Sequence, residues 1–196
     1  SGQPPTLATA NGEVDVIQFF TNDHLTFYGV HLNAPPTVPD RLASGFLTIP
    51  RWATNTTSLS LGGSGSLHLT YFDADKTAAV TTVGVRSGGT AAGATPTLAR
   101  IGLYSVAVNG DLTLIASTTN DTSLFAAANT NYSKSFSAGA TVARGQRLAV
   151  GVLVVSGATM PTLVGNSGNA GSSELAIAPR LCGLVASQSD LPSSVS

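Results

Sequence analysis

Charged residues are scarce in this sequence. Only 10% of its 196 residues are charged, nine Lys and Arg against ten Asp and Glu, whereas soluble domains average about 25%. The formal net charge is -1, so the chain lacks the basic face that neutralises nucleic-acid phosphates. We therefore expect no nucleic-acid partner.

Cysteine and long apolar runs are also nearly absent. Cys182 is the single cysteine, which excludes an intrachain disulfide and a cysteine-based zinc site, and its context RLCGLV favours a buried, inert thiol. No run approaches the ~18 consecutive apolar residues of a membrane span, so we expect no membrane insertion. Hydrophobic residues still make up 42% of the chain, enough to build a core.

Small and hydroxylated residues fill much of the remainder. Ser, Thr, Gly and Pro together occupy 77 of the 196 positions. Between Gly- and Ser-rich turns lie short runs in which apolar and polar residues alternate, as in SLHLTYFD and ARIGLYSVAV. Alternation with period two and no convincing helical period predict an all-β protein, a jelly-roll-like antiparallel β-sandwich with an extended N-terminal arm.

Composition divides the chain into three parts. Residues 1–44 contain an aromatic-rich stretch and then the proline-rich NAPPTVPD, and we expect an arm that attaches to a neighbouring protein or straps onto an adjacent subunit. The sandwich is predicted over residues 45–187. Residues 188–196 read as a polar C-terminal tail.

Three local patterns make sharper predictions. Asn109-Gly110 lies between two alternating runs and predicts a β-hairpin whose two turn residues have positive φ. QRLAVGVLVV, residues 146–155, is apolar on both faces, which predicts a central strand covered on both sides or a strand whose outer face meets another subunit. TNDTSLFAAAN, residues 119–129, is compatible with a helical turn that places Leu124 and Phe125 as a plug at one end of the sandwich.

Groups that carry catalysis are few and scattered. The sequence holds two glutamates, eight aspartates and three histidines, without the spacing of a zinc site or of a nucleophile elbow. Asp73 and Asp75 are the densest acidic pair and could ligate calcium, but Lys76 follows them and a solvated turn is the favoured interpretation. We expect no catalytic residues, no metal and no cofactor.

Sugar binding is the chemistry that the remaining residues suit. Aromatic rings stack on sugar faces while amides and carboxylates bind the hydroxyl groups, so the candidate binding residues are Trp52, Tyr71, Asp73, Asp75, Tyr104 and Tyr132. Trp52 has a second interpretation, which we favour, as a seal at the base of the sandwich or at a seam between subunits.

Four segments of the main domain follow one another in this order: SLHLTYFDADKT, the long segment from Ser87 to Ala126, ARGQRLAVGVLVV and APRLCG. Through these segments, residues 66 to about 183 resemble a module of minor tail proteins from phages that infect actinobacteria. The resemblance covers roughly two thirds of the chain and leaves out the N-terminal 44 residues. The family places this module at the end of a tail or fibre protein, and it offers no catalytic residue to transfer.

The resemblance implies a virion protein, made in the cytoplasm of the bacterial host, that binds glycans of the host envelope. A purely structural virion protein, such as a head fibre or capsid decoration, is the alternative, and an enzyme that degrades polysaccharide is a further one. We expect a homotrimer, because fibre tips are commonly three-fold and residues 146–155 are apolar on both faces. Other virion proteins are expected to bind through the arm.

Overall fold

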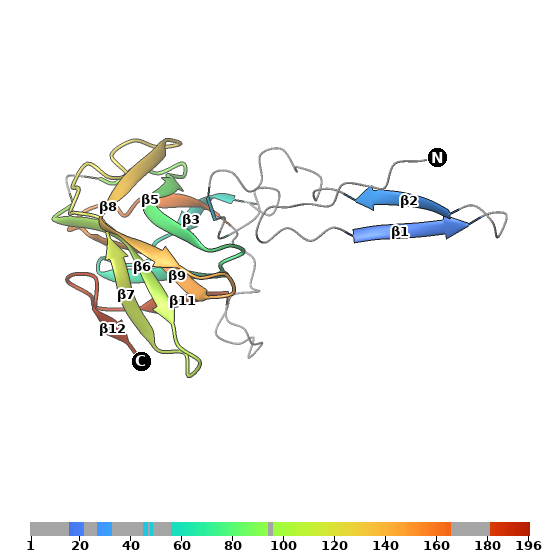
Figure 1. Cartoon of the computed structure of the whole chain (residues 1–196). Helices are drawn as coiled ribbons and strands as arrows, with labels where there is room; N and C mark the ends of the chain where they lie inside the picture. The colour runs from blue at the N-terminus through green and yellow to red at the C-terminus, as the bar shows by residue number, and fades with distance from the viewer. Residues whose placement is uncertain are drawn as a thin grey trace. The chain divides into compact units, whose positions relative to one another are not determined.

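The computed structural model describes residues 16–21, 27–32, 45, 46, 48, 56–93, 96–165 and 181–196. The chain divides into two compact units, Ser1–Gly45 and Phe46–Ser196. In the first unit, strands β1 (Val16–Thr21) and β2 (Phe27–Leu32) form an antiparallel pair with Val16 opposite Leu32 (Figure 1). Trp52 lies outside the described residues.

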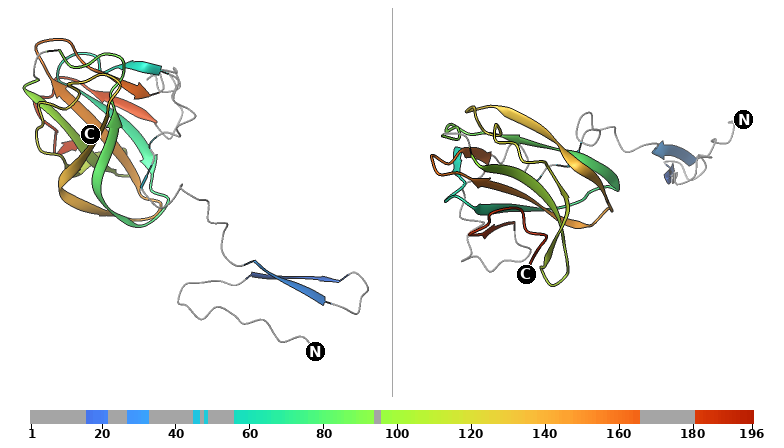
Figure 2. Two further views of the ribbon diagram at one scale, coloured as in Figure 1. Left: turned by 90° about the horizontal axis from the view of Figure 1, so that it is seen from above. Right: turned by 90° about the vertical axis from the view of Figure 1, so that its left-hand side faces the viewer.

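The second unit is built from antiparallel strands in two layers (Figures 1 and 2). The larger sheet has the order β11-β4-β9-β6-β7-β12, and the smaller sheets pair β10 with β3 and β5 with β8. The strands are β3 (Thr56–Ser60), β4 (Ser66–Asp73), β5 (Ala78–Arg86), β6 (Leu98–Val106), β7 (Leu112–Ser117), β8 (Asn131–Val142), β9 (Arg147–Val155), β10 (Thr162–Gly165), β11 (Cys182–Val185) and β12 (Ser194–Val195).

One single bridge joins the two small sheets into the second layer, and another connects the large sheet to β8. Ser87 pairs with Leu163, which links β5 to β10, and Thr118 pairs with Phe136, which links the end of β7 to β8. No helix occurs among the described residues. The predicted all-β antiparallel sandwich is therefore confirmed.

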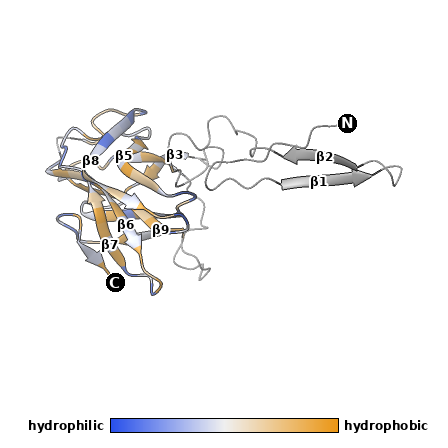
Figure 3. Ribbon diagram, viewed as in Figure 1, coloured by the Kyte–Doolittle hydropathy of each residue, from blue (hydrophilic) through white to orange (hydrophobic). Residues whose placement is uncertain are grey.

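The space between the layers is filled by every second residue of the strands, the residues that face inward. Ile101 and Val154 of the large sheet pack with Leu163 and Phe125, and Leu103 and Leu148 pack with residues of β8. Figure 3 shows hydrophobic residues along much of β7 and β9. Burial of this inner face is the main source of stability for such a fold.

The central strand β9 is also apolar on its outer face, and the chain itself covers that face. Ala149 and Leu153 are fully buried, and they cluster with Leu67 and with Leu191 from the C-terminal segment. The prediction of a central strand covered on both sides is confirmed for a single chain. The two-sided pattern of β9 consequently needs no second subunit to explain it.

A pair of glycines forms a hollow on this outer face. Gly102 of β6 and Gly151 of β9 are direct cross-strand partners, and the ring of Tyr104 lies over both of them. A Cβ atom added at either glycine would lie 2.9 or 3.0 Å from Cε2 of Tyr104. The aromatic ring fills the space that two missing side chains leave, an arrangement known from other sheets as rescue of glycine by an aromatic residue.

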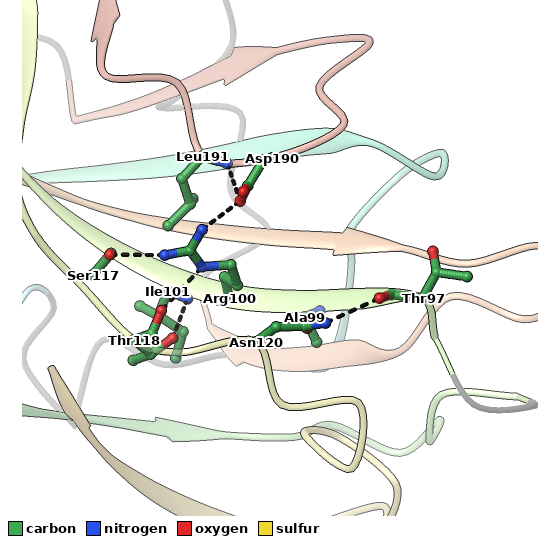
Figure 4. Close-up of polar contacts among 9 residues, drawn as sticks. All are labelled: Thr97, Ala99, Arg100, Ile101, Ser117, Thr118, Asn120, Asp190 and Leu191. Carbon is green, nitrogen blue, oxygen red and sulfur yellow. Dashed lines mark hydrogen bonds and ion pairs between the residues drawn. The ribbon is translucent and has the colours of Figure 1, made fainter. Parts of the chain in front are cut away.

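The last residues of the chain belong to the packed unit, and their prediction as a separate polar tail was wrong. Leu191 is only 8% exposed and packs in the hollow at Gly102, and β12 pairs with β7. Asp190 forms an ion pair with Arg100, with 2.7 Å between Oδ1 and Nη1 (Figure 4). A single leucine among serines was too weak a pattern to predict this packing.

The hairpin at Asn109-Gly110 is confirmed, but its turn differs from the predicted type. Ala107 and Asp111 close the loop, so its three residues are 108–110, and among them Gly110 alone has a positive φ, of 96°. The amide of Gly110 donates to the carbonyl of Ala107, and the amide of Ala107 donates to the carbonyl of Asp111. This is a three-residue loop that ends in a glycine bulge, so asparagine does not need the left-handed conformation.

Residues 119–129 form turns rather than a helical turn, because Asp121 binds the amide and hydroxyl of Ser123 with its own carboxylate. Leu124 and Phe125 are nevertheless 1% and 0% exposed and pack into the inner core. Their predicted role as a plug is confirmed.

The prediction of a buried thiol was wrong, since Cys182 is exposed on the edge strand β11.

Candidate functional site

The sandwich unit has two ends that differ in their residues. Phe46, the first residue of the unit, packs against Phe72 at the end that carries loops 73–77, 107–111 and 143–146, which we call the proximal end. Loops 61–65, 87–93, 118–130 and 156–161 lie at the opposite, distal end. The predicted binding residues that the structure describes are divided between these ends and the core.

Tyr71 and Asp73 are brought together with Arg147 at the proximal end, and we call these three residues the proximal cluster. The register of β4 and β9 places Asp73 opposite Arg147, and alternation places Tyr71 on the same face. The guanidinium carbon of Arg147 lies 5.7 Å from the centre of the Tyr71 ring, and Nη1 lies 3.1 Å from Oδ1 of Asp73.

The proximal cluster is a polar surface rather than an open aromatic platform. Arg147 covers one face of the Tyr71 ring by a cation–π contact, and the Asp73 side chain remains 63% exposed. An exposed carboxylate beside a guanidinium offers acceptors and donors to neighbouring hydroxyl groups of a sugar. The sequence indicated Tyr71 and Asp73, but it did not indicate Arg147, which is 74 residues away.

Asp75 lies in the adjoining turn and is exposed. The turn is closed by backbone hydrogen bonds from Ala74 to Gln146 and from Gly145 to Ala74. Within the part of the chain that the structure describes, no group of three His, Cys, Asp or Glu side chains is placed to hold a metal ion. Asp73 instead pairs with Arg147, which favours the solvated-turn interpretation of this acidic sequence.

Tyr104 is a core residue, so its prediction as a sugar platform was wrong. It is 0% exposed, because its ring fills the hollow above Gly102 and Gly151 and is covered by Leu191. Its buried hydroxyl group has no hydrogen-bond partner among the residues that the structure describes, and burial raises the pKa of Tyr104 to about 12. Alternation along the sequence could not distinguish a covered outer face from an exposed one.

Tyr132 lies at the distal end and supports a loop. Its ring meets Phe125 edge to face at 5.6 Å between centroids, and its hydroxyl group accepts a 2.9 Å hydrogen bond from the amide of Ala127. Phe125 and Asn129 both have positive φ, of 69° and 53°, which is uncommon for residues other than glycine. Tyr132 therefore stabilises a loop with an unusual backbone, and its half-buried ring packs mainly on the core.

Asp121 and Lys134 form an ion pair beside this distal loop, a feature that the sequence analysis missed. The side chains are 25% and 31% exposed. The hydrogen bond from Lys134, followed by that from Ser123, lowers the pKa of Asp121 to about 2. The ion pair thus ties β8 to the turn that precedes Phe125.

Asp121→Asn is expected to lower the free energy of unfolding by about 1 kcal/mol at pH 7, allowing for the partial exposure of the pair. Because the pKa of Asp121 is lowered in the folded state, its contribution is complete above pH 3.8 and is lost as the pH falls toward 2. Urea unfolding of both proteins from pH 7 to pH 2 should show the difference vanish at the acid end. A difference that stayed constant with pH would contradict the ion pair as its cause.

Buried or paired groups elsewhere also have structural roles. His68 binds the carbonyl oxygen of Leu61 through Nε2 at 2.7 Å, and burial lowers its pKa. Asp190 pairs with Arg100, so three of the five described aspartates are each held by a different cation. Among the described residues, these three ion pairs lie in separate places, and each one orients the charges of its two side chains.

Comparison with protein-family models, with curated proteins and with solved structures found no match for this chain. The residues that the structure describes include no helix long and apolar enough to cross a membrane. The interpretation of function therefore depends on the surface chemistry described above and on the sequence resemblance.

Proposed function

We propose that this chain is a tail or fibre component of a bacteriophage that infects actinobacteria, and that it binds a glycan of the host envelope without enzymatic activity. The observation that carries the proposal is the resemblance of residues 66 to about 183 to the module of minor tail proteins, in which the matching segments follow one another in the same order. The proximal cluster supports it, because a guanidinium, a carboxylate and a tyrosine on one face match the hydroxyl groups of a sugar.

A homotrimer is part of the proposal. Contacts between one domain and a sugar are individually weak, and three linked copies raise the effective concentration of each binding face. Because the outer face of β9 is covered by the chain itself, the subunit contacts of such a trimer would involve other surfaces. Sedimentation of the full chain at micromolar concentration tests this point, and a stable monomer would remove it.

Binding to isolated cell walls tests the main proposal. The full chain should co-sediment with cell walls of a susceptible actinobacterium, and a polysaccharide fraction released from those walls should compete. Cell walls of an unrelated Gram-negative bacterium serve as the control. Absence of binding to the actinobacterial walls would sink the glycan-binding function and favour a structural virion protein.

The proximal cluster can be tested in the same assay. Asp73→Asn combined with Asp75→Asn should weaken binding at least tenfold, because the loss of charged hydrogen bonds to sugar hydroxyl groups costs about 1.5–3 kcal/mol each. Asp111→Asn, in another loop of the proximal end, is the matched control and should bind as the unaltered chain does. If the double variant bound unchanged, the glycan site would lie elsewhere while the proposed function would stand.

A further inference from the structure

The C-terminal residues 187–196, which we call the strap, are held on the large sheet by hydrogen bonds, by one ion pair and by the packing of Leu191 and Val195. The amide of Gln188 donates a hydrogen bond to the carbonyl of Gly65, and Asp190 pairs with Arg100 (Figure 4). The carbonyl of Ser193 accepts the amide of Leu114. Leu191, at 8% exposed, is the most buried residue of the strap, and Val195 packs partly against the same cluster.

Two features of the closed strap cost free energy. Among the described residues the Tyr104 hydroxyl group has no hydrogen-bond partner, and it is buried under the cluster that Leu191 completes, so it lacks the hydrogen bonds that water would provide. Ser187, where the strap begins, has a φ of 59°, a conformation that residues with a Cβ atom adopt at a cost. Lifting the strap would relieve both, since water could reach Tyr104 and Ser187 could relax.

We propose that the strap detaches from the sheet as a unit about Ser187 while the rest of the sandwich stays folded. The exposed position of Asp190, whose side chain is 55% accessible, lets water compete for its ion pair. The open state uncovers the apolar outer face of the large sheet around Leu67, Tyr104 and Leu112. The strap is therefore a built-in cover, and this inference does not depend on the proposed function.

Amide hydrogen exchange of the full chain, followed by NMR, tests the proposal. The amide of Leu114 reports strap opening because it donates to Ser193, whereas amides of the central strand β9, such as that of Val152, exchange only when the sheet unfolds. Leu114 should exchange faster than Val152 and with a smaller dependence on urea. Equal rates with equal urea dependence would overturn the proposal.

Two variants shift the opening equilibrium in opposite directions. Asp190→Asn, which removes the charge but keeps an oxygen acceptor for the amide of Leu191, should speed exchange at Leu114 about threefold. Tyr104→Phe keeps the ring and removes the unpartnered hydroxyl group, so it should slow exchange at Leu114 about tenfold. Exchange at Leu114 that did not slow in Tyr104→Phe would show that this hydroxyl group stays buried when the strap moves, and would overturn the proposed opening.

Discussion

Gly151→Val is expected to lower the free energy of unfolding by about 3 kcal/mol, at the upper end of the usual cost of overpacking. A Cβ atom at Gly151 would lie 2.8 Å from Leu67 Cδ1 and 3.0 Å from Tyr104 Cε2. Leu67 and Tyr104 are both 0% exposed, so neither side chain can move aside without disturbing the outer cluster. Urea unfolding followed by tyrosine fluorescence or circular dichroism measures the loss.

Gly84→Val is the matched control for this prediction. Gly84 also lies within a strand, β5, but it is exposed, and a Cβ atom there would meet only the carbonyl oxygen of Tyr132 at 3.9 Å. Valine suits an open strand position better than glycine, so this variant should be neutral or more stable by about 0.5 kcal/mol. Similar losses at both positions would show that the close contacts with Leu67 and Tyr104 are not the cause of the loss at Gly151.

Phe125→Ala is expected to lower the free energy of unfolding by about 3–5 kcal/mol, because it empties the plug at the distal end. The side chain is 0% exposed and packs with Ile101, Leu124 and Val154 of the inner core. It also contacts the Tyr132 ring, and its carbonyl oxygen accepts the amide of Ala92. Chemical unfolding measures the effect.

Phe125→Gly distinguishes the packing contribution from that of the backbone. A protein with glycine in a loop or strand is usually less stable than one with alanine at the same position. At a φ of 69°, however, glycine avoids the backbone strain of about 1 kcal/mol that alanine retains. We therefore expect Phe125→Gly to be the more stable of the two variants by about 1 kcal/mol, despite its smaller side chain. The usual order, with alanine more stable, would contradict the left-handed conformation at this position.

Much of the fold could be predicted from local pattern because a strand places successive residues on opposite faces. The alternation in residues 66–73 and 98–106 and the apolar stretch of β9 each depend on that rule alone. Asn109-Gly110 predicted the hairpin, whereas its turn type depended on how β6 and β7 join, which a dipeptide does not specify. Of the candidate site, Tyr71 and Asp73 could be predicted from residue type, but their contact with Arg147 depends on the register between two distant strands.

The amino-acid sequence by itself determined that this chain forms antiparallel strands with little charge on their surface, because period-two hydrophobicity and tight turns are local properties. Only the tertiary structure decided which apolar faces are covered. Tyr104 and Leu191 lie 87 positions apart. The local sequence around either residue does not show that both fill the hollow above Gly102 and Gly151. Burial is a property of contacts between distant segments, so the core residue and the strap that covers it became visible only in three dimensions.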